Sequence, residues 1–144
     1  MRSATALKLL SAILFFFALG HTLGTADPRA QRGAPEAAVF AAMKAFQFPI
    51  MGFTRSHWDF YRGFAITITV LLLMLATITW QLAGIAQRNP REALPIALTL
   101  LVGCAALLIV GFEFFFWGPI VTSVVAVACA TLVVIASRRA TPEP

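Results

Sequence analysis

Four long stretches of this chain of 144 residues contain no charged side chain. They cover residues 9–26, 63–87, 93–112 and 114–137, with lengths of 18, 25, 20 and 24 residues. A helix needs roughly 20 mainly apolar residues to cross the hydrocarbon of a bilayer, and an uncharged run of about 18 is already a candidate. The pattern predicts an all-α, polytopic membrane protein in which four transmembrane helices form an antiparallel bundle.

The composition argues against several other classes of protein. Charged residues make up 12% of the chain and apolar residues 60%, whereas about a quarter of a soluble domain is charged. A water-soluble globule, a disordered chain and a disulfide-stapled secreted domain are therefore disfavoured. The basic residues are scattered along the chain and gather on no single face, so nucleic acid is not an expected partner.

The expected elements form a single transmembrane domain over residues 1–144. Spanning helices are predicted at about 4–24, 56–87, 91–116 and 119–137, with a short helix at about 36–47. In this short helix Val39, Met43 and Phe46 recur at helical spacing, which is typical of a helix lying in the headgroup region, apolar side down. Phe48 and Pro49 are predicted to end it, and the apolar residues 48–53 are expected to stay near the membrane surface.

Two short connections are predicted between the last three helices. The third spanning helix is expected to begin with a cap at Asn89, a first-turn proline at Pro90 and a third-position acid at Glu92. A tight turn is therefore predicted between the second and third spanning helices. Gly118 and Pro119 are predicted to divide the third helix from the fourth. Both connections are short enough to make the joined helices antiparallel.

The first apolar stretch has two interpretations. Lys8 and Arg2 precede an apolar core, and Gly24 and Ala26 are small enough for a cleavage site before Asp27, so a cleaved signal peptide is one alternative. We expect a retained helix, because the apolar stretch is longer than the usual core of a signal peptide.

The distribution of lysine and arginine predicts the orientation. The positive-inside rule places the more basic short segments in the cytoplasm. The two termini and the turn at residues 88–92 share one face, which holds six of the eleven basic residues in a short length of chain: Arg2, Lys8, Arg88, Arg91, Arg138 and Arg139. Both termini are therefore expected in the cytoplasm and the long first loop outside.

Alternating helix direction brings separated polar residues to the outer face. This face receives the end of the first helix, the start of the second and the end of the third, which carry His21, Asp59, Arg62 and Glu113. His21, Asp59 and Glu113 are the candidate catalytic residues. The candidate substrate-binding residues are Arg62, His57, Trp58, Tyr61 and Trp117.

Each catalytic candidate also has a structural interpretation. Glu113 either pairs with Arg62 or His21 in the bundle, or reaches headgroup water from a helix end. Asp59 lies three residues after Ser56, so the two can form a capping box, and Arg55, Asp59 and Arg62 would share one face of a helix.

His21 lies between Gly20 and Gly24, a small-xxx-small pair that lets another helix approach closely. That approach would bring the imidazole to Asp59 or Glu113. Cys104 and Cys129 fall in the middle of spanning runs, where cysteines behave as small apolar residues. No ligand spacing for a metal and no fingerprint for a cofactor occurs, so neither is expected.

The residues GHTLG at 20–24, IMGFTRSHWDFYRGF at 50–64 and the four-helix plan resemble a family of small bacterial integral membrane proteins. In size and layout the chain is also loosely similar to DoxX-type proteins. The resemblance covers most of the chain, implies a bacterial cytoplasmic membrane and assigns no activity. Quinol-linked oxidation, with which DoxX-type proteins are associated, is not carried over, because no residue here matches a functional motif of that family.

Three functional hypotheses follow. The first is a structural or accessory subunit, not an enzyme, that associates with itself or with a larger membrane complex through glycine-lined faces. The second is a membrane enzyme or binder of a lipophilic small molecule, with an outer-leaflet pocket formed by His21, Asp59, Arg62 and Glu113. The third, a proton-coupled transporter, is weaker, because ionisable groups on such pathways usually lie near the midplane.

Overall fold

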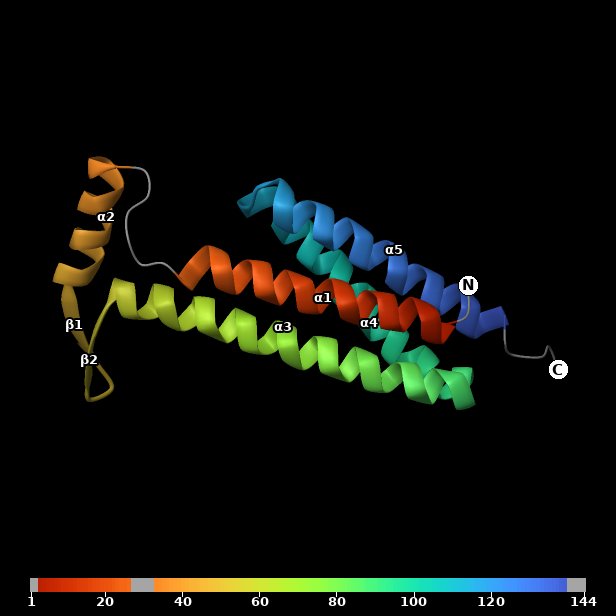
Figure 1. The fold of residues 1–144 in the computed structure, drawn as a ribbon. Helices are drawn as coiled ribbons and strands as arrows, with labels where there is room; N and C mark the ends of the chain where they lie inside the picture. Colours follow the sequence, from red (N-terminus) through yellow and green to blue (C-terminus); the bar gives the residue numbers. More distant parts are fainter. Residues whose placement is uncertain (1–2, 27–32, 140–144) are drawn as a thin grey trace. The chain divides into compact units, whose positions relative to one another are not determined.

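The computed structural model describes residues 3–26 and 33–139, which form five helices and a β-hairpin (Figure 1). The helices are α1 (Ser3–Ala26), α2 (Ala34–Ala45), α3 (His57–Arg88), α4 (Pro90–Phe114) and α5 (Trp117–Arg139), and the strands are β1 (Gln47–Ile50) and β2 (Phe53–Ser56). Four helices, α1, α3, α4 and α5, are long and apolar enough to cross a membrane. The helical prediction is confirmed in these elements. Arg2 and the predicted cleavage point before Asp27 lie outside the described residues.

The turn between α3 and α4 is built as its sequence predicts. Asn89 is the N-cap of α4, and its side-chain Oδ1 accepts a hydrogen bond from the Arg91 N–H at 3.2 Å. Its Nδ2 donates to Glu92 Oε1 at 2.7 Å. Pro90 starts the helix, where its missing N–H costs no intrahelical bond.

The break between α4 and α5 comes earlier than predicted. The two helices are separated at Phe115 and Phe116, whereas Gly118 and Pro119 belong to the first turn of α5. Proline is tolerated in a first turn because that N–H has no intrahelical partner. Here Pro119 therefore marks the beginning of a helix and not the gap before it.

The β-hairpin was not predicted. Strand β1 pairs with β2 in antiparallel register, with Ile50 opposite Phe53 next to the turn. Both turn residues have positive φ, 47° at Met51 and 86° at Gly52, as a type I′ turn requires. The usual sequence signal for that turn is Asn-Gly or Asp-Gly. Here the pair is Met51 and Gly52, so the turn could not be recognised from the sequence.

Pro49 lies inside β1, opposite Thr54. Proline lacks the N–H that a central strand must donate, so it is confined to edge strands. A two-stranded ribbon has only edge strands, and Pro49 is compatible with this one. A proline inside an apolar run therefore does not exclude a short hairpin.

The chain divides into two compact units. The first combines the chain up to Phe17 with the chain from Leu72 onward, and the second is Ala18–Leu71. Buried residues of the first unit come from α1, α3, α4 and α5. The largest of its fully buried side chains are Leu7, Leu10, Thr79, Val133 and Ser137.

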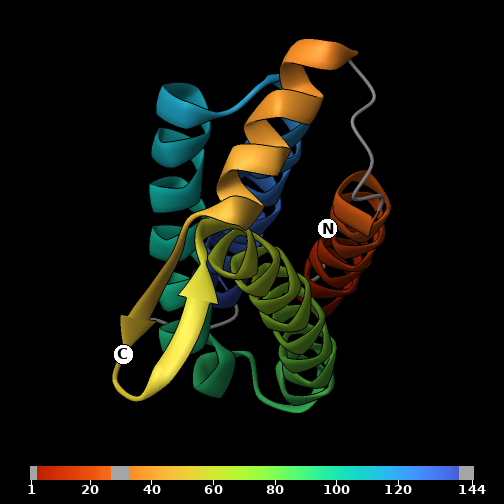
Figure 2. The same ribbon diagram turned by 90° about the vertical axis from the view of Figure 1, so that its left-hand side faces the viewer.

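Helices α4 and α5 form an antiparallel pair (Figure 2). The buried residues of α4 are spaced four, three, four and then seven residues apart: Ala93, Ala97, Leu100, Cys104 and Gly111. This spacing is the seam of helices packed at a small crossing angle. Cys104 and Cys129 are free thiols buried in the unit, as expected of small apolar residues.

In the second unit, α2 packs across the beginning of α3 (Figure 1). The ring of Phe40 on α2 lies 5.0 Å from the ring of Trp58 on α3, measured between centroids. The Lys44 ammonium lies 4.6 Å from the centre of the Trp58 ring, in a cation–π contact. These contacts fix the angle at which the short helix meets the long one.

Candidate functional site

A groove in the second unit lies between the end of α1 and the first half of α3. Its volume is about 250 Å³. It is lined by three threonines, one arginine and three apolar residues: Thr22, Thr25, Thr69, Arg62, Ala65, Ile66 and Val70. Because hydroxyl and guanidinium groups lie in it beside aliphatic ones, we call it the polar groove.

His21 lies beside the polar groove and joins α1 to α3. Its Nε2 is 3.0 Å from the carbonyl oxygen of Ala65. A carbonyl only accepts, so Nε2 is the donor and carries a proton. Of the two partners that the sequence suggested, Asp59 and Glu113, Asp59 is not bonded to His21 among the described residues: the His21 ring contacts the Ala65 carbonyl, and Asp59 Oδ2 accepts from Ser56.

Two threonine hydroxyls meet inside the polar groove. Thr22 Oγ1 and Thr69 Oγ1 are 3.1 Å apart. Each can also donate to a carbonyl one turn back, Thr22 to Ala18 at 2.8 Å and Thr69 to Ala65 at 3.3 Å. The two hydroxyl groups have one proton each, and each hydrogen bond needs one proton, so at most two of these three hydrogen bonds are formed at once.

Arg62 reaches from α3 to the last turn of α1. Its Nη1 donates to the carbonyl oxygen of Thr25 at 3.3 Å, one residue before α1 ends at Ala26. A cation at a helix C-terminus satisfies a carbonyl without an intrahelical partner and interacts favourably with the helix dipole. Arg62 thus stabilises the end of α1 at one side of the polar groove.

Asp59 is occupied by a capping box. Its Oδ2 accepts from the Ser56 N–H at 2.8 Å and from Ser56 Oγ at 2.9 Å, and Ser56 Oγ accepts from the Asp59 N–H at 3.2 Å. This reciprocal pair confirms the structural interpretation of the Ser56–Asp59 spacing. Arg55 is a residue of β2, not of α3, so the predicted helical face of Arg55, Asp59 and Arg62 does not exist.

The other predicted residues of the second unit lie in aromatic contacts. The His57 ring stacks on Phe46 with centroids 5.6 Å apart and an interplanar angle of 12°. Trp58 stacks on Tyr61 at 5.4 Å. These side chains pack α2 and the hairpin against α3.

Glu113 and Trp117 belong to the first unit. Glu113 is the penultimate residue of α4 and Trp117 the first of α5, and both side chains are exposed. Their predicted meeting with His21, Asp59 and Arg62 stays a prediction.

The glycines around His21 do not mediate its contact with α3. Among the described residues, and apart from the adjoining residues and backbone of α1 itself, no atom lies within 4 Å of a Cβ built at Gly20 or Gly24. Within the described residues of the second unit, which contains both glycines, the expected close approach to another helix is not seen, and the face that carries them is open.

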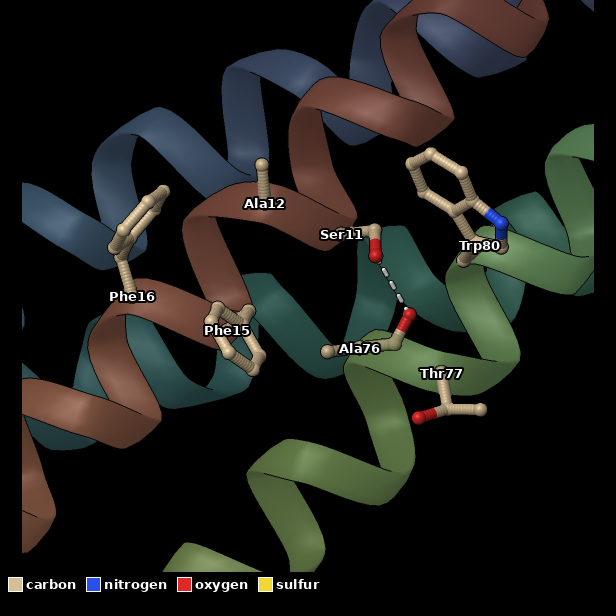
Figure 3. A pocket seen from close by; sticks show the side chains of 7 residues that line it. All are labelled: Ser11, Ala12, Phe15, Phe16, Ala76, Thr77 and Trp80. Carbon is tan, nitrogen blue, oxygen red and sulfur yellow. Dashed lines mark hydrogen bonds between the residues drawn. The ribbon is translucent and has the colours of Figure 1, made fainter.

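A second groove, which the sequence did not indicate, lies in the first unit (Figure 3). It has a volume of about 360 Å³ and runs between α1 and α3. Its lining is mainly apolar: Ser11, Ala12, Phe15, Phe16, Ala76, Thr77 and Trp80. We call it the tryptophan groove. Ser11 Oγ donates to the Ala76 carbonyl at 2.7 Å and joins the two helices beneath it.

Four of the described helices are long and apolar enough to cross a membrane, which indicates an α-helical membrane protein. Comparisons with protein families, with curated proteins and with solved structures find no match for this chain. The likeness to DoxX-type proteins therefore stays a resemblance of size and layout.

Proposed function

We propose that this chain is a structural or accessory membrane protein that associates with itself or with a larger membrane complex. One observation carries the proposal. In the second unit, the side chains best suited to chemistry form hydrogen bonds with backbone groups of the chain itself. His21 bonds to the Ala65 carbonyl, Arg62 donates to the Thr25 carbonyl, and Asp59 accepts from the Ser56 N–H. Polar side chains commonly join neighbouring helices in this way in membrane proteins.

In this proposal the four long helices form an antiparallel bundle in the bacterial cytoplasmic membrane, with both termini in the cytoplasm. The buried residues that all four contribute to the first unit support the bundle. Helix α2 would lie in the interface as a surface helix. Its position across the start of α3 supports this, because a helix crossing the end of a spanning helix runs along the membrane plane (Figure 1).

Association through the open face of α1 is supported by Gly20 and Gly24, which are spaced as in helix dimers of membranes. The test is the mass of the full chain in detergent, measured by light scattering coupled to gel filtration. Wild-type protein is expected as an oligomer, and Gly20→Ile with Gly24→Ile as a monomer. The fold of the monomer should persist, because a Cβ added at either glycine meets no other element of the described residues within 4 Å.

The matched control is Gly103→Ile on α4, where a Cβ also meets nothing within 4 Å. This variant should keep the wild-type mass. A monomeric wild-type chain, or equal dissociation by the α4 substitution, would contradict association through α1.

A second candidate function, the binding of an anionic lipophilic molecule, is favoured by the polar groove itself. The Arg62 guanidinium and three threonines would orient an anionic head, while Ile66 and Val70 would line its apolar part. Asp59 is not among the lining residues, so it has no role in this version.

Dodecyl phosphate can serve as the probe for this second function. In a neutral detergent it should raise the unfolding temperature of the wild-type chain, but not that of Ile66→Trp, which fills the polar groove. Ile68→Trp is the control, because Ile68 is 41% exposed and lies outside the lining. Equal responses of the two tryptophan variants would exclude binding in this groove.

A further inference from the structure

We propose that the tryptophan groove is a binding site for one anionic phospholipid, with its phosphate at Lys8 and an acyl chain along Phe15. This site belongs to the first unit and shares no residue with the polar groove. It does not depend on either function proposed above.

The shape of the groove fits an acyl chain. Ser11 and Ala76 form a floor of small residues, held together by the hydrogen bond between them. Trp80 and Phe15 stand at its sides, 57% and 45% exposed (Figure 3). A volume of about 360 Å³ lies in the range of sites for small ligands, roughly 300–1,000 Å³.

The charge at one end of the groove fits a phosphate. Lys8 precedes Ser11 and Ala12 by three and four residues, so it shares their face of α1. Its Nζ lies 5.4 Å from the centre of the Trp80 ring, which lines the groove. Within residues 3–26 and 33–139, Lys8 forms no ion pair with a carboxylate, and it borders the uncharged run that begins at Leu9.

The direction of the groove agrees with the direction of a lipid in a leaflet. Lys8 lies five residues from the start of α1 at Ser3, near one end of the span. Phe15 follows seven residues later, about 10 Å deeper at 1.5 Å per residue. A lipid with its head at Lys8 therefore extends its chain toward the middle of the bilayer.

The choice of an anionic lipid rests on Lys8. A zwitterionic lipid could seat the same chain but would gain little from a single cation. One lysine near the surface contributes roughly a fivefold preference for anionic lipid, by the usual attraction per basic residue. The cation–π contact with Trp80 holds the ammonium at the rim, where a phosphate can reach it.

The test is native mass spectrometry of the full chain, delipidated and titrated with phosphatidylglycerol or phosphatidylcholine of the same acyl chains. Wild-type protein should bind one phosphatidylglycerol per chain, about fivefold more tightly than phosphatidylcholine. Lys8→Gln should abolish that preference. Trp80→Ala should weaken the binding of both lipids, because it removes one side of the groove.

The control is Arg88→Gln, which removes an equal charge at the end of α3, eight residues beyond Trp80. It should leave both affinities within twofold of wild type. The proposal is overturned if Lys8→Gln keeps the preference, if Arg88→Gln loses it to the same extent, or if Trp80→Ala binds both lipids as wild type does. Circular dichroism confirms that each variant is folded.

Discussion

A single side chain, Ser56, starts the longest helix of the molecule. It is buried, and with Asp59 it exchanges three hydrogen bonds. The backbone N–H groups at a helix start have no intrahelical partners. Ser56 and Asp59 supply partners for two of these groups and thereby set where β2 stops and α3 begins.

Replacement of Ser56 by alanine should loosen the first turn of α3. The lost cap is expected to cost about 1 kcal/mol, and amide exchange of residues 57–60 should become faster in the detergent-solubilised chain. Thr54→Ala is the control, because Thr54 is exposed two residues upstream. Unchanged exchange in Ser56→Ala would show that the cap is dispensable.

Replacement of Glu113 by glutamine distinguishes its two interpretations. The side chain is exposed at the penultimate position of α4, so we expect a change in unfolding free energy below about 0.5 kcal/mol. A broken buried ion pair would cost about 3–5 kcal/mol. Thermal unfolding in detergent gives the value, with Glu92→Gln as the charge-matched control. A loss in the larger range would support pairing with Arg62 or His21.

Contacts of single residues could be predicted from the sequence only where the two partners lie a few positions apart along the chain. The capping box followed from the spacing of Ser56 and Asp59 along the chain. The partner of His21 could not be predicted, because the Ala65 carbonyl is a backbone group that has no signature in the sequence. The tryptophan groove was missed because Ser11, Phe15 and Trp80 become neighbours only when α1 packs on α3.

Among the elements, the hairpin depends on an unusual turn. Met51 is 94% exposed and has a φ of 47°, a region that non-glycine residues other than Asn, Asp and His rarely adopt. The backbone strain of the turn is confined to Met51, because Gly52, the second residue with a positive φ, adopts it at no steric cost.

Met51→Asn should therefore stabilise the hairpin. Asparagine tolerates the left-handed conformation, and a gain of about 1 kcal/mol is expected from the strain relieved. Gly52→Val should have the opposite effect, because a branched side chain is strained at a φ of 86°. Amide exchange of residues 47–56 measures both changes. Faster exchange in Met51→Asn would contradict the turn assignment.

The helices were predictable because uncharged runs of about 20 residues leave few alternatives to a spanning helix. The exact breaks were harder. Proline and glycine signal both gaps and first turns, so Pro119 indicated a boundary without showing on which side of it the helix lies. The hairpin was missed because residues 47–56 contain a proline and lack the usual turn pair.

For the whole molecule, four crossings of the membrane would place both termini on one side of it. Single cysteines in a chain with Cys104→Ala and Cys129→Ala can test this with a membrane-impermeant maleimide. Thr54→Cys and Trp117→Cys should react on intact cells, and Gln87→Cys only after permeabilisation. Thr54 and Trp117 on opposite sides would contradict four crossings, and a reversed pattern would invert the orientation.

The joint between β2 and α3 has a consequence for how the chain responds to its surroundings. Strand β2 ends at Ser56 and α3 begins at His57, with no linker residue between them. The uncharged stretch of α3, residues 63–87, has 25 residues and a length of about 38 Å, against a hydrocarbon thickness of about 30 Å. A helix of this length tilts more in a thinner bilayer. Because no linker residue separates β2 from α3, we expect the hairpin to move with the helix when its tilt changes, so that bilayer thickness would alter the position of the hairpin at the surface.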